Sequence, residues 1–87
     1  MNFNGKYSIR QTSQPGDLRQ VQTGNADGRF IEIVTGFDIA KDRFSVHIYI
    51  TPQGGEREKV QAGDIYGADV RTAFQEGWKF LDSYLGS

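Results

Sequence analysis

The chain has a single histidine, and its neighbours supply the three residue types of a hydrolase triad. His47 follows Ser45 by two positions in a strand-like segment, and Asp38 lies in the strand-like segment before it. Residues two apart on one strand stand about 7 Å from each other, whereas proton transfer needs about 3 Å. A flat sheet face also offers no oxyanion hole. We therefore expect no catalytic residues and interpret these three as part of a solvated polar face.

Metal and acid–base chemistry are disfavoured by the residue types. With one histidine and no cysteine, the chain lacks the usual ligands of a transition-metal site. Asn25, Asp27 and Glu32 offer oxygen ligands, but their spacing differs from an EF-hand calcium loop, and Asn, Asp and Gly are typical turn residues. Acidic pairs on a predicted edge strand and hairpin tip should be solvated, namely Glu56 with Glu58 and Asp38 with Asp42. We expect no cofactor, no metal ion and no enzymatic activity.

The length and composition predict one soluble domain over residues 1–87. Ile, Leu, Val and Phe make up 21 of the 87 residues, which is enough for one hydrophobic core. The formal net charge is -1, too balanced to indicate a polybasic nucleic-acid or membrane binder. Because neither a long apolar run nor a signal-like leader is visible, we expect a cytoplasmic protein with no membrane partner.

The middle of the chain predicts a β-hairpin. Segments 30–40 and 43–51 are rich in β-branched and aromatic residues, with only Lys41 and Asp42 between them. Pairing Ala40 with Arg43 makes one face almost wholly apolar. That face would pair Ile39 with Phe44, Phe37 with Val46, Thr35 with Ile48 and Ile33 with Ile50. The reverse face would pair Asp38 with Ser45, Gly36 with His47, Val34 with Tyr49 and Glu32 with Thr51. Lys-Asp fits a type I′ turn poorly, which leaves room for a loop one or two residues longer.

Weaker patterns lie on both sides of this hairpin. Residues 5–12 alternate as a half-buried strand does, with Phe3, Tyr7 and Ile9 on one side. Residues 14–17 and 24–28 are turn signals, and residues 18–23 between them could return as a polar strand. After the hairpin, residues 57–61 predict a short, charged edge strand.

Residues 64–85 predict an amphipathic helix with Asp64 as its N-cap. Apolar residues from Tyr66 to Leu85 fall within one arc of a helical wheel, and charged residues occupy the opposite side. Such a helix is long enough to lie along the apolar face of the sheet. The predicted fold is therefore α+β: an antiparallel meander of four to five strands with one C-terminal amphipathic helix packed on one face.

An excess of aromatic residues favours a small, non-catalytic protein–protein interaction module. Phe80 lies just outside the apolar arc of the helix and Trp78 at its other margin, while Val34, His47 and Tyr49 lie on the reverse sheet face. Trp78 and Phe80 could instead cap the edges of the core. The partner would be another protein or a second copy of the chain, and an accessory subunit, an inhibitor or an antitoxin-like protein would all fit.

The alternative is a nucleic-acid-binding domain that uses the exposed sheet face. Its contacts would include Arg10, Arg29, Arg43 and Tyr49, with Arg19 and His47 on the same surface. Three strands followed by a long helix is similar to the order of elements in integrase-type and plant AP2-type DNA-binding domains, in topology alone. Acidic residues on the same hairpin and the lack of a basic cluster weigh against this function.

Overall fold

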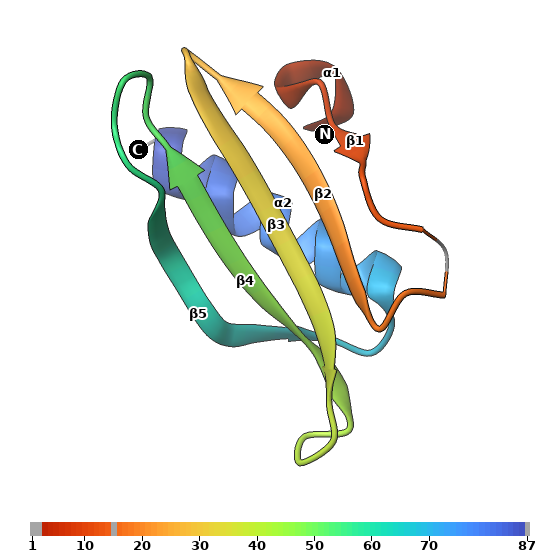
Figure 1. Ribbon diagram of the computed structural model, residues 1–87. Helices are drawn as coiled ribbons and strands as arrows, with labels where there is room; N and C mark the ends of the chain where they lie inside the picture. The colour runs from red at the N-terminus through yellow and green to blue at the C-terminus, as the bar shows by residue number, and fades with distance from the viewer. Residues whose placement is uncertain (1–2, 15, 87) are drawn as a thin grey trace.

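Five antiparallel strands form one sheet, and a long helix crosses one of its faces (Figure 1). This computed structural model describes residues 3–14 and 16–86. Strand order in the sheet follows the chain, so the α+β class and the meander order are confirmed. The elements are α1 (Phe3–Tyr7), β1 (Arg10–Gln11), β2 (Arg19–Ala26), β3 (Arg29–Asp38), β4 (Arg43–Thr51), β5 (Glu58–Gly67) and α2 (Val70–Gly86).

The strand predicted over residues 18–23 exists and is longer than expected. It continues as β2 through Gly24 to Ala26, and only Asp27 and Gly28 form the turn into β3. Both turn residues have positive φ, 50° and 80°, which is the backbone of a two-residue type I′ turn. The prediction that residues 24–28 are all turn was therefore wrong in extent. Upstream, Asp17 N donates to Gln14 O across the predicted turn, whose Pro15 lies outside the described residues.

The β3–β4 hairpin has the predicted faces but a different register. Phe37 pairs with Phe44 and Thr35 with Val46, a shift of two residues from the predicted pairs. The loop spans residues 39–42, because the Asp38 carboxylate accepts hydrogen bonds from the Ala40 and Lys41 amides and holds a wider turn. As a result, Ile39 is 86% exposed at the tip instead of lying in the core.

The N-terminal segment is a short helix rather than the predicted strand over residues 5–12. A short stretch after it still lies along β2: Arg10 and Gln11 pair with Thr23 and Gln22, and Thr12 N donates to Val21 O. The Tyr7 side chain is buried, stacks on Trp78 at 5.3 Å between ring centroids and donates a hydrogen bond to Asp82 Oδ1 at 2.6 Å. The apolar side chains were therefore correctly assigned to the core, although the backbone reaches it as a helical turn.

The predicted helix start at Asp64 was also wrong. Strand β5 runs to Gly67, so Tyr66 belongs to the sheet, and the expected edge strand over residues 57–61 is twice as long as predicted. Helix α2 begins at Val70, where Asp69 acts as the N-cap and accepts a hydrogen bond from Thr72 N at 2.7 Å. The chain turns tightly here, since a Cβ on Gly67 would lie 2.4 Å from Ala73 N.

The core lies between α2 and the sheet. In the middle of the sheet, strand side chains that face the helix are buried and meet one stripe of α2. Apart from glycines, the buried residues in the described part of the chain are Tyr7, Ile31, Ile33, Thr35, Val46, Ile48, Ile50, Ala73, Phe74, Trp78 and Leu81. Within the described residues, neither helix has the length and apolar character needed to cross a membrane.

Candidate interaction surface

The second face of the sheet is open, because α2 and the buried Tyr7 of α1 lie on the other side (Figure 1). The strand registers place Val21, Val34 and His47 side by side across β2, β3 and β4 in the middle of this open face. All three side chains are half-buried. The open face therefore has an apolar, uncharged row at its centre.

Basic side chains border this central row. The row on one side of it contains Arg10, Glu32, Tyr49 and Lys59. The row on the other side contains Arg19. Arg43 lies further along, at the hairpin end, where it is paired with Asp38. Arg57 joins them from the loop before β5. Five basic and two acidic residues thus lie on a face of a chain whose net charge is -1. Asp64 stands in the β5 bulge, outside these rows.

The Arg57 guanidinium is held in place by two contacts. It lies 3.7 Å from the centre of the Tyr49 ring, and its Nε donates to Glu32 Oε1 at 2.8 Å. The side chain is still about half exposed, at 52%. An exposed arginine ordered in this way loses less conformational entropy when a partner binds.

The surroundings of His47 favour its neutral form. Burial lowers the pKa of its imidazole, and the positive charges of Lys59 and Arg19 lower it further. Its Nε2 lies 3.4 Å from Ser45 Oγ, and its buried Nδ1 has no hydrogen-bond partner among the described residues. A neutral ring suits the apolar row in which it stands.

Ser45 Oγ and His47 Nε2 lie 3.4 Å apart, closer than the distance of about 7 Å expected for residues two apart on a strand, but Asp38 does not join them. Ser45 is opposite Gly36 and not Asp38, which corrects the predicted pairing. The Asp38 carboxylate instead accepts hydrogen bonds from loop amides, and among the described residues no carboxylate bonds to the imidazole. The described residues also contain no group of three or more His, Cys, Asp or Glu placed to hold a metal ion.

The predicted interaction residues divide between the two sides of the sheet. Val34, His47 and Tyr49 share the open face, although Val34 pairs with His47 rather than Tyr49. Trp78 is only 2% exposed and belongs to the core. Phe80 packs partly against the core and stacks on Tyr84, with 6.1 Å between ring centroids.

Of the residues expected to contact nucleic acid, Arg10, Arg43 and Tyr49 lie on the open face. Arg29 lies on the helix side, where it lines a small cavity with Tyr7 and Leu85. Arg19, which the sequence also suggested for a basic sheet surface, lies on the open face as well. Sequence reasoning missed the open-face contributions of Val21, Arg57 and Lys59. Alternation along residues 19–25 was the available signal for Val21, but the pattern is weak because both faces of β2 are largely polar.

Comparisons with protein-family models, with curated proteins and with solved structures found no match to this chain.

Proposed function

We propose that the protein is a small, non-catalytic interaction module that binds an acidic surface of another protein through the open face of its sheet. The supporting observation is the arrangement of that face: an uncharged row of Val21, Val34 and His47 between two basic borders. Protein interfaces commonly have an apolar centre and a charged rim, and arginine is enriched among the residues that dominate their binding energy.

Charge decides between another protein and a second copy. Two open faces packed together would bring five basic side chains of one copy against five of the other, with only two acidic residues on each. An acidic partner instead gains attraction at the rim and faster encounter. We therefore expect light scattering to show that the isolated chain is a monomer. If the wild-type chain is instead a dimer, and Val34→Glu converts it to a monomer, the open face binds a second copy and the proposed partner is wrong.

Affinity capture with matched variants tests the proposal. The tagged wild-type chain is compared with Val34→Glu, which places a charge in the apolar row, and with Ser83→Glu, which places the same charge on the exposed side of α2. We expect an acidic protein that is captured by wild type and Ser83→Glu and lost with Val34→Glu. Binding of the purified partner should weaken as salt increases. If no captured protein depends on Val34, the proposed surface is wrong.

A nucleic-acid-binding sheet is the second candidate, favoured by the shared location of Arg10, Arg43 and Tyr49. Two features oppose it. Arg57 already covers the Tyr49 ring on which a base would stack, and Glu32 lies within the same row. Titration with a mixed single-stranded oligonucleotide at low salt separates the candidates, because nucleic-acid binding should be strong there and decrease steeply with salt. Absence of binding at low salt eliminates this function.

A further inference from the structure

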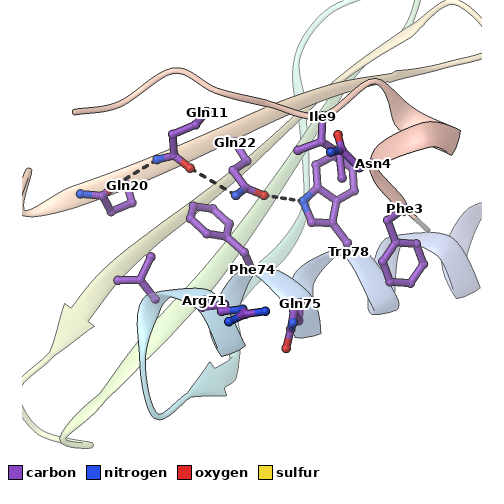
Figure 2. A pocket seen from close by; sticks show the side chains of 11 residues that line it. Phe3, Asn4, Ile9, Gln11, Gln20, Gln22, Arg71, Phe74, Gln75 and Trp78 are labelled. Atoms are coloured by element: carbon purple, nitrogen blue, oxygen red, sulfur yellow. Dashed lines mark hydrogen bonds between the residues drawn. The ribbon is translucent and has the colours of Figure 1, made fainter. Parts of the chain in front are cut away.

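A groove of about 840 Å³ runs between the N-terminal half of α2 and the segment that contains β1 and β2 (Figure 2). It lies on the helix side of the sheet and is separate from the open face. Its apolar lining consists of Phe3, Ile9, Val70, Phe74 and Trp78. A volume of this size is within the range of small-molecule sites, which are typically lined by apolar and aromatic side chains with a few polar groups.

A fixed row of glutamine side chains forms the strand side of the groove. Trp78 Nε1 donates to Gln22 Oε1 at 2.8 Å, and Gln22 Nε2 donates to Gln11 Oε1 at 3.2 Å. Gln11 Nε2 then donates to Gln20 Oε1 at 2.9 Å, and Gln20 Nε2 is held by two backbone carbonyls. Because each amide is ordered by the next, the groove wall is preorganised and a ligand would not have to immobilise it.

Some polar groups that line the groove still have hydrogen-bond donors that are not used by any residue the structure describes. Gln22 Nε2 has two hydrogens and uses one of them within the described residues. The side chains of Asn4, Gln75 and Arg71 also line the groove and make no hydrogen bond or ion pair to the part of the chain described by the structure. These groups are donors available to an oxygen-bearing ligand.

The charge of the groove specifies the ligand class. Among the described residues that line it, Arg71 alone is charged. A guanidinium binds a carboxylate in a two-pronged geometry that an ammonium lacks, and the apolar walls would take a hydrocarbon chain or ring. We infer that this groove binds a small apolar molecule with a single carboxylate, held by Arg71 at one end and by the aromatic walls along its length.

Decanoate is a suitable probe, because Trp78 is the only tryptophan of the chain and reports directly on the groove. Calorimetry measures binding, and Trp78 emission locates it. We expect saturable heat with a parallel change in emission, and at least about tenfold weaker binding of methyl decanoate, which lacks the charge. Binding without a change in Trp78 emission, or equal binding of acid and ester, would overturn the inference.

Two variants of α2 complete the test. Arg71→Gln should reduce decanoate affinity at least about tenfold, to the level of the ester. Lys79→Gln removes the same charge from the same helix outside the groove and should leave affinity unchanged. Circular dichroism checks that both variants fold. If Arg71→Gln binds as well as wild type, or Lys79→Gln loses as much affinity, the attraction is not specific to this groove and the inference is wrong.

Discussion

The two faces of the central strands carry similar apolar residues but are stabilised differently. On the face covered by α2, Ile33, Val46 and Ile48 are completely buried. On the open face, Val21 and Val34 are only half-buried and have basic neighbours. The helix therefore decides which row becomes core, and the other row keeps apolar surface at the centre of a charged face. Three pairs of substitutions and one pair of pH windows test this difference.

The largest expected difference is between truncations on the two faces. Ile48→Ala removes a fully buried side chain and should lower the free energy of unfolding by about 2–5 kcal/mol. Val34→Ala, on the open face, should lower it by less than about 1 kcal/mol. Urea unfolding followed by circular dichroism measures both. Equal losses would show that the open face is as tightly packed as the core.

Two strand glycines provide a second comparison. A Cβ on Gly24 would lie 2.7 Å from Trp78 Cη2 and 2.9 Å from the Tyr7 carbonyl oxygen, so Gly24→Ala should destabilise the fold by about 1–3 kcal/mol. A Cβ on Gly36 would meet no atom within 4 Å. Gly36→Ala should be neutral or stabilise by up to about 1 kcal/mol, since alanine restricts the unfolded chain. The same urea titration distinguishes them, and a neutral Gly24→Ala would contradict the close approach of Trp78.

Threonines on the two faces should respond in opposite ways to loss of the hydroxyl. Thr35 is fully buried, and its Oγ1 has no hydrogen-bond partner in the described part of the chain. Thr35→Val should therefore raise the free energy of unfolding by about 1 kcal/mol, because an unpaired buried hydroxyl is costly. Thr23→Val on the half-exposed side should change it by no more than about 0.5 kcal/mol. A loss of stability in Thr35→Val would indicate a bound water at Oγ1.

The smallest expected effects are losses of stability as the pH falls, in two separate pH windows. The pKa of His47 is lower in the folded chain than its ordinary value of 6.5, so protonation of the imidazole favours the unfolded chain. The contribution of the neutral imidazole to stability is therefore complete above pH 6.5 and is lost as pH falls through the folded pKa. His47→Gln should remove this loss from urea midpoints measured between pH 8 and 5. A wild-type midpoint that does not change over this range would show that His47 protonates without cost on the open face.

On the covered side, the corresponding window lies at lower pH. Hydrogen bonds from Lys6 and Tyr7 lower the pKa of Asp82, so its contribution is present above the ordinary value of 3.8 and is lost as pH falls through the folded pKa. Asp82→Asn should reduce the acid loss in this window and leave the loss that depends on His47 unchanged. If both losses disappear together, the two sites are coupled across the sheet.

Alternation and helical periodicity were sufficient to predict the class of fold and which residues of the hairpin face the helix. They did not fix the β3–β4 register, because Asp38 stabilises a four-residue loop by accepting backbone hydrogen bonds that periodicity does not show. The N-terminal helix was missed although Phe3 and Tyr7, four residues apart, fit one helical face as well as one side of a strand. Asp64 and Asp69 are equally good caps in isolation, and only the pairing of β5 with β4 distinguishes them.

The candidate sites were less accessible to sequence reasoning than the fold. Val34, His47 and Tyr49 were placed on one face because a two-residue shift in register preserves the face. The groove was not predicted, since its wall depends on contacts such as Trp78 to Gln22, which are 56 positions apart. Long-range hydrogen bonds of this kind leave no periodic signal in the sequence.

The strand order also has a kinetic consequence. Each strand pairs with its neighbour in sequence, so the sheet can assemble by closing short loops, which favours rapid folding. The contacts from Lys6 and Tyr7 to Asp82 join residues 76 and 75 positions apart and must wait until α2 is in place. We therefore expect substitution of Tyr7 to accelerate unfolding while leaving the refolding rate nearly unchanged.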